Sequence, residues 1–350
     1  MTESQPAQPT RRTGLARRVL PAVGLALLAP WVAEYLMGSH SVRDLPLIVF
    51  LVPMYGGGAL LVREVSRRAG RGWPTILLLG LAYGVIEAGL LDQSLFNPDY
   101  SGLDFQSVAP IPGLRVSAYF TLLFVAGHAI WSIGVPIAIV ESLVPDRATT
   151  PWLRTPGLVV AALLYLGGGA IIYTELRSTE SFQASTLQST VAAVAALALV
   201  VAAFTVPHRH APGAEAPHRP SRPAIRAPEH RLPVLLLALV VSRLLWMPEN
   251  WLGVGITATL LAGTTWLVLR WSASPQWSQG HRLALAGGAL LVHAWDGFHL
   301  HPWRAISPGE ELASDILFTL AAITLLLVTI RRVRRHRRRV EESPSLLAAG

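Results

Sequence analysis

The chain has 350 residues, of which 52% are hydrophobic and only 14% are charged, and its mean hydropathy of +0.44 excludes an ordinary soluble domain. It contains no cysteine, which excludes disulfides, thiolate metal sites, iron–sulfur clusters and cysteine nucleophiles. The net charge of +8 comes from arginines between apolar runs, so we expect membrane topology to explain it and expect no nucleic-acid partner.

Ten apolar stretches approach the roughly 20 residues that a helix needs to cross the hydrocarbon core of a membrane. We therefore predict an all-α bundle of about ten transmembrane helices. The first stretch follows Arg11 and Arg12 and continues through Trp31 to Leu36, which is typical of a membrane helix and not of a cleaved export signal. The predicted spans are 19–37, 45–63, 74–91, 117–141, 157–175, 187–206, 232–248, 251–270, 283–299 and 314–331.

The connections between these spans differ in character. The segment from Asp92 to Val116 is long and rich in turn residues, so it is a candidate lid or binding loop. The segment 207–231 is rich in Pro, Arg and His, which predicts a flexible basic linker between a bundle over 1–206 and a bundle over 232–331. Residues 332–350 are predicted to form a basic tail.

Arginine accounts for all 29 basic residues apart from histidine, and its distribution predicts the orientation of the chain. Alternate gaps between the spans hold 24 arginines, whereas the other gaps hold four and one lies inside a span. Cytoplasmic loops retain arginine during insertion, so we expect both termini in the cytoplasm. The same parity favours two helices around Pro248 over one interrupted helix. We expect anionic lipid headgroups as partners of the arginine clusters and a bacterial plasma membrane as the location.

Six ionisable side chains lie inside five of the predicted spans, where they are costly and therefore informative. Counted at 1.5 Å per residue, all of them come within about 10 to 15 Å of the outer face of a ~30 Å core. We predict that they form one polar layer, either as a site or as mutually neutralising pairs that hold the helices in register. The six are Glu34, Glu87, His128, Arg243, His293 and Asp296.

Two further patterns invite a chemical interpretation. His293, Asp296 and His299 follow one another at three-residue intervals, a spacing that could bind a divalent metal, but anchoring at the outer surface is the simpler use and we predict no metal. The three glycines at 56–58 lie in the middle of a span and indicate close helix packing, not phosphate binding. No phosphate-binding loop or dinucleotide fingerprint is present, so we expect no cofactor.

The sequence Phe124-Val125-Ala126-Gly127-His128, together with Glu87 in the preceding span, resembles motifs of the glutamate-dependent intramembrane protease superfamily, which includes CAAX-processing and bacteriocin-processing proteases. The resemblance implies that Glu87 acts as a base and His128 as its partner in activating water against a peptide bond. The chain departs from the pattern at Ala88, where the superfamily has a second Glu, and after His293, where Asp follows at three residues instead of four.

Three classes of function remain open at this point. The first is an intramembrane hydrolase that uses Glu87 and His128. The second is a transporter or proton-coupled permease in which the same polar layer binds substrate or protons, although no internal repeat of the kind common in transporters is visible. The third is a structural or regulatory subunit of a membrane complex.

Overall fold

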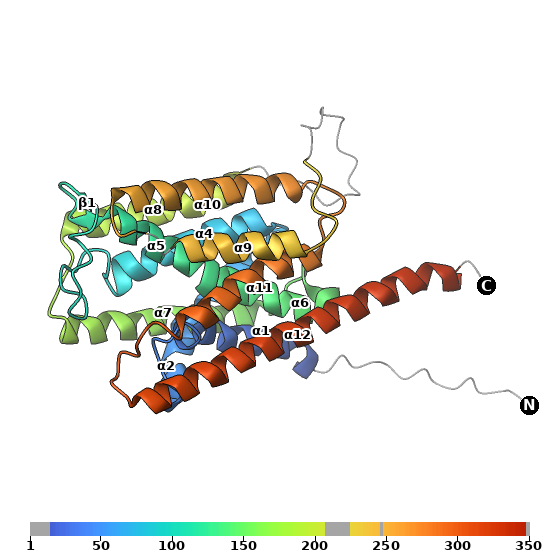
Figure 1. Ribbon diagram of the computed structural model, residues 1–350, viewed down its shortest axis with the longest axis horizontal. Helices are drawn as coiled ribbons and strands as arrows, with labels where there is room; N and C mark the ends of the chain where they lie inside the picture. The colour runs from blue at the N-terminus through green and yellow to red at the C-terminus, as the bar shows by residue number, and fades with distance from the viewer. Residues whose placement is uncertain (1–14, 207–224, 246–247, 348–350) are drawn as a thin grey trace, which may run out of the picture.

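In the computed structural model, residues 15–206, 225–245 and 248–347 are described, with the backbone alone for 15–18 and 343–347. Helices occupy each of the ten predicted stretches and pack side by side into one bundle (Figure 1). Of the linker predicted over 207–231, residues 207–224 lie outside the described residues.

The first half of the bundle contains helices that are interrupted by short segments of other helical types. The chain passes through α1 (Leu15–Pro30), η1 (Trp31–Tyr35), η2 (Val42–Leu47), α2 (Ile48–Leu51), η3 (Val52–Gly56), α3 (Gly57–Arg68), α4 (Trp73–Ile86), η4 (Glu87–Leu91), α5 (Ala118–Gly127), η5 (His128–Gly134), α6 (Val135–Leu143) and η6 (Pro145–Arg147).

The second half contains longer uninterrupted helices: α7 (Thr155–Thr179), α8 (Thr186–Thr205), α9 (Leu232–Leu244), α10 (Trp251–Trp271), α11 (Gln279–Asp296) and α12 (Pro308–Leu347). The helices α9 and α10 are separate, as the arginine parity predicted. Much of the predicted tail is helical, because α12 continues to Leu347.

Seven helical segments of the described chain are long and apolar enough to cross a membrane, and α9 and the segment Val19–Tyr35 are shorter apolar helices. The exposed surfaces of α7, α8 and α10 are largely apolar, which suits contact with lipid. An all-α membrane bundle is therefore confirmed, whereas the number of spans stays a prediction.

The long connection between α4 and α5 is folded over one end of the bundle. It contains a two-stranded antiparallel hairpin in which β1 (Pro110–Ile111) pairs with β2 (Val116–Ser117). The Ser117 side chain then caps α5 by accepting a hydrogen bond from the backbone N–H of Phe120 at 3.1 Å.

The arginine-rich ends of the helices meet at the opposite end of the bundle. Arg71 donates to the carbonyl oxygen of Val206 at the end of α8 (3.0 Å), and Arg332 in α12 donates to that of Leu143 at the end of α6 (3.3 Å). The start of α1 and the end of α12 also lie at this end, away from β1 (Figure 1).

Glycines allow the closest helix contacts, as predicted for positions 56–58. A Cβ atom on Gly56 would lie 2.4 Å from the carbonyl oxygen of Ala26 in α1, and one on Gly58 would lie 2.4 Å from the ring of Tyr83 in α4. A Cβ on Gly57 would lie 2.9 Å from the backbone of Tyr165 in α7. The three glycines thus pack against three different helices.

A buried network of four charges joins α3 to α6 and to the turn that follows it. Arg67 binds both carboxylate oxygens of Glu141 (2.8 and 2.7 Å), and Arg63 contacts Glu141 at 3.1 Å and Glu64 at 2.5 Å. Arg63 also donates to three backbone carbonyl oxygens and lies over the ring of Trp152. Because the charges balance and the donors are satisfied, the network can be buried without a large net penalty.

Candidate functional site

Glu87 and His128 are in direct contact between two neighbouring helical segments. The Nε2 atom of His128 lies 2.7 Å from Oε2 of Glu87, and the two side chains are 18% and 5% exposed. The sequence placed both in one layer, and the structure brings them together as a pair. Glu87 is therefore almost fully enclosed, whereas part of the His128 ring remains exposed.

The second ring nitrogen of His128 fixes how many protons the pair holds. Nδ1 lies 2.7 Å from the carbonyl oxygen of Phe124, and because a carbonyl oxygen can only accept, Nδ1 must carry a hydrogen. Without a further proton, the lone pair of Nε2 would face the carboxylate of Glu87 at 2.7 Å, which is repulsive. The short distance therefore favours one proton between Nε2 and Oε2, as an ion pair or as a neutral pair, while the angle of approach leaves Oε2 without a regular hydrogen bond among the described residues.

Tyr55 extends this pair to a second carboxyl group. Its hydroxyl lies 2.5 Å from Oε1 of Glu34 and 3.4 Å from Oε1 of Glu87. The Tyr55 hydroxyl has one hydrogen, so it can donate a hydrogen bond to only one of the two carboxylates. It can also accept a hydrogen bond from the other carboxyl group when that group is protonated. The residues Glu34, Tyr55, Glu87 and His128, named here the proton-sharing cluster, thus form a continuous chain of proton-exchanging groups.

Each member of the proton-sharing cluster lies in a π-helical segment, in which backbone N–H groups bond to the carbonyl five residues earlier. Glu34 is in η1, Tyr55 in η3, Glu87 in η4 and His128 in η5. Such turns are rare and are frequently found at functional sites. Four of them meeting at one cluster are a strong structural sign of a site.

Three of these wide turns lie beside a proline. Pro30 directly precedes η1, Pro53 lies within η3, and Pro136 follows the end of η5 by two residues. Proline has no N–H and its ring collides with the carbonyl four residues earlier, which disrupts the regular helical ladder. These three prolines inside apolar stretches are the sequence signal from which the site could have been found.

Gly84 sets the distance between Glu87 and His128. It lies one turn before Glu87, and a Cβ atom there would come within 2.8 Å of the carbonyl oxygen of Val125 and 3.1 Å of the Cβ of His128. Only glycine lets the backbones of α4 and α5 approach this closely.

We expect Gly84→Ala to lower the free energy of unfolding by about 1–3 kcal/mol, because the added methyl group has no space and the neighbouring atoms are backbone. Gly24→Ala is the matched control, since no atom lies within 4 Å of its added Cβ. Thermal unfolding of the purified protein in detergent measures both. Equal effects of the two substitutions would contradict the tight α4–α5 contact.

Aromatic rings surround the cluster. The ring of Tyr55 stacks near that of His128, with centroids 6.4 Å apart, and Tyr83 lies 6.0 Å from His128 and 5.9 Å from Tyr165. The hydroxyl of Tyr83 is buried and forms no hydrogen bond with any described residue. The cluster therefore has one spare buried donor close to it.

Asp92 is a further acidic group of the site, and sequence analysis counted it as part of the loop. Its backbone N–H bonds to the carbonyl of Glu87 at 3.0 Å, and its carboxyl group interacts electrostatically with Glu87 and His128. Burial, followed by the nearby charge of Glu87, raises the pKa of Asp92 well above its usual range.

His293 and Asp296 lie in the same part of the bundle as the proton-sharing cluster, but their neighbours are not members of that cluster. The ring of His293 stacks on Trp131 at 4.2 Å and its Nδ1 lies 3.1 Å from the carbonyl oxygen of Val32. His293 therefore joins three helical segments, which is the helix-holding use that the sequence allowed. Asp296 is buried at the end of α11, where the helix stops.

A family model described as "Uncharacterized membrane protein family" matches residues 23–335, which is most of the chain. The chain belongs to this family. No curated protein and no solved structure matches it. The match gives no support to the resemblance to the glutamate-dependent proteases. It supports a multi-pass membrane protein, in agreement with the apolar helices.

Within this membrane protein, Arg243 does not join the polar layer. Its side chain is exposed near the end of α9, and among the described residues it forms no ion pair with Glu34 or Glu87. The hypothesis that it neutralises these carboxylates is wrong, because counting depth along a helix gives the height of a side chain but not the direction in which it points.

The possible metal ligands after position 292 do not converge either. His299 is exposed and its Nδ1 lies 2.9 Å from the carbonyl oxygen of Trp295, whereas His293 is buried against Trp131. In the part of the chain that the structure describes, no group of three or more His, Asp or Glu side chains is arranged to hold a metal ion.

Proposed function

We propose that this protein is a proton-coupled transporter whose proton site is the proton-sharing cluster. The observation that carries the proposal is the unbroken chain from Glu34 through Tyr55 and Glu87 to His128, with contacts of 2.5, 3.4 and 2.7 Å. Each residue comes from a different π-helical segment, so a change in protonation changes the contacts between helices and not only within one.

The contact between Glu87 and His128 gives the coupling a physical cause. With a proton between Nε2 and Oε2, the contact attracts α4 to α5. Without it, a lone pair faces a carboxylate in a medium of low dielectric constant, and the repulsion favours separation. Binding and release of one proton can thus shift the protein between two packings of these helices.

A glutamate-dependent hydrolase is the second candidate, and the direct contact of Glu87 with His128 favours it. A hydrolytic base must reach a water molecule. Here Oε2 of Glu87 is buried against Nε2 of His128, Nδ1 of His128 is bound to a backbone carbonyl, and Oε1 of Glu87 lies towards Tyr55. This arrangement suits proton sharing better than activation of water, so transport is the proposal.

We place the protein in a bacterial plasma membrane with ten spans and both termini in the cytoplasm. Two observations support this orientation: the arginine parity of the sequence and the meeting of the arginine-rich helix ends at one end of the bundle. The exposed arginines of α12 beyond position 330 would then face anionic lipid headgroups, the partners proposed for them.

Access to the cluster from both sides of the membrane tests the transporter proposal. The chain has no cysteine, so Gly127→Cys introduces a single thiol beside His128, where the nearest atoms to the added Cβ are 3.8 Å away. We expect an impermeant thiol reagent to label it in right-side-out and in inside-out vesicles. Gly167→Cys, on a part of α7 with no atom within 4 Å, is the control that should stay unlabelled in lipid.

Labelling of Gly127→Cys from one face only would contradict alternating access. Labelling from neither face would favour a sealed structural cluster instead.

A further inference from the structure

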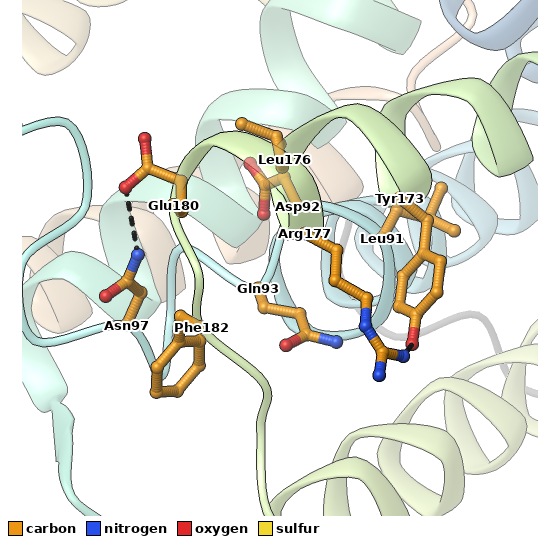
Figure 2. A pocket seen from close by; sticks show the side chains of 9 residues that line it. All are labelled: Leu91, Asp92, Gln93, Asn97, Tyr173, Leu176, Arg177, Glu180 and Phe182. Carbon is orange, nitrogen blue, oxygen red and sulfur yellow. Dashed lines mark hydrogen bonds between the residues drawn. The ribbon is translucent and has the colours of Figure 1, made fainter.

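A small, partly open cavity lies where η4 runs into the long connection that follows it. Figure 2 shows its lining, which combines Asp92 and Gln93 from this connection with Tyr173, Arg177 and Glu180 from the last turns of α7. The space for the centre of a water-sized sphere is about 10 Å³, which is close to what one water molecule requires.

Asp92 lies between this cavity and the proton-sharing cluster. It lines the cavity, and it follows η4 directly, with its backbone N–H bonded to the carbonyl of Glu87. Its carboxyl group interacts electrostatically with Glu87 and His128. Among the described residues that line the cavity, Asp92 is thus the one whose electrostatic interaction with Glu87 and His128 links the cavity to the cluster.

No arginine of the described residues forms an ion pair with the carboxyl group of Asp92. Oδ1 accepts from the backbone N–H of Ser94 (2.9 Å) and Oδ2 from the hydroxyl of Tyr100 at a long 3.4 Å. Within the described structure, Asp92 has no ion pair with Arg177, which instead donates to Tyr173 at 3.1 Å.

Glu180, the other acidic residue that lines the cavity, also has hydrogen-bond partners. Glu180 accepts from the side chain of Asn97 (3.1 Å) and from the backbone N–H of Ser101 (3.0 Å), so it ties the connection to α7. Asp92 therefore interacts with Glu87 and His128 and lines the cavity together with Arg177 and Glu180, and its weakly held Oδ2 is the atom most able to exchange a proton.

We infer that Asp92 is the proton port of the cluster on the side of the long connection, an inference that rests on the proposed proton-coupled function. Oδ2 of Asp92 takes a proton from hydronium in the cavity and leaves water. The O–H bond on Asp92 then breaks as the proton passes to Glu87, and Asp92 returns to its carboxylate. Release to the same side runs through these steps in reverse.

Time-resolved infrared spectroscopy of proteoliposomes tests this assignment. The readout is the infrared difference band of the Glu87 side chain, either its carboxylic C=O band or its shifted carboxylate band, that Glu87→Gln removes, followed after a step in the external pH. We expect Asp92→Asn to slow the appearance of this band by about tenfold or more while its final amplitude is unchanged. Asp99→Asn is the matched control, because Asp99 is an exposed acid of the same connection. A small permeant weak acid such as formic acid should restore the rate in Asp92→Asn.

The outcomes separate the two proposals. If Glu87→Gln removes no band, the proposed function fails. If the band is present and Asp92→Asn leaves its rate unchanged, Asp92 is not the port although the cluster still binds the proton. A slow rate that formic acid does not restore would mean that Asp92 only maintains the local structure, and would also overturn the inference.

Discussion

Replacing Glu87 with glutamine is expected to abolish the uptake of the proton that Glu87 shares with His128, because the pair loses the carboxylate that holds it. The glutamine side chain has the same shape and can donate to Nε2 of His128, so that ring stays neutral with its hydrogen on Nδ1. The pair then no longer gains or loses a proton, and any transport that depends on it should stop.

Proton uptake on a pH step, measured with an indicator dye on the purified protein, checks this prediction. Glu175→Gln is the matched control, because Glu175 is exposed on α7 and lies outside the proton-sharing cluster. Equal proton uptake by wild type and Glu87→Gln would contradict a shared proton at the Glu87–His128 pair.

Replacing Glu141 with glutamine is expected to lower the free energy of unfolding by about 3–5 kcal/mol. The substitution keeps the shape of the side chain but leaves the buried guanidinium groups of Arg63 and Arg67 with one balancing carboxylate, Glu64. An uncompensated charge in this position cannot reach water without opening the contact between α3 and α6.

Glu341→Gln provides the control for this prediction. Glu341 also pairs with an arginine, Arg337, but both side chains are more than half exposed, so its loss should change the stability by less than about 1 kcal/mol. Unfolding in detergent measures both variants. Adding Arg67→Met to Glu141→Gln restores neutrality and should recover part of the loss, whereas no recovery would mean that charge balance is not what the network needs.

The sequence allowed the central pair to be predicted because ionisable residues are rare in apolar runs. Glu87 and His128 stood out in spans that are neighbours along the chain, and counting residues put them at one depth. Tyr55 and Asp92 did not stand out, since tyrosine is common in membrane helices and Asp92 follows the last apolar residue. The wide turns that bring them to the site depart from the regular α-helix, whose rise of 1.5 Å per residue was used to count depth.

The sequence could not distinguish arginines that only indicate topology from arginines whose side chains pair inside the bundle. Arg63 and Arg67 counted as topology signals, yet their side chains are buried and paired with Glu141. Arg243 counted as part of the polar layer, yet it is exposed. A tally of charges per loop predicts the side on which a helix ends, but the direction of each side chain depends on packing that only the folded bundle determines.

The proton between Glu87 and His128 can be observed directly by nitrogen-15 NMR of the His128 ring, assigned with a variant that lacks this histidine. The account predicts a protonated Nδ1 in every state and an Nε2 chemical shift that changes when Glu87 is replaced by glutamine. A bare Nδ1, or the same Nε2 shift with and without the Glu87 carboxylate, would contradict it.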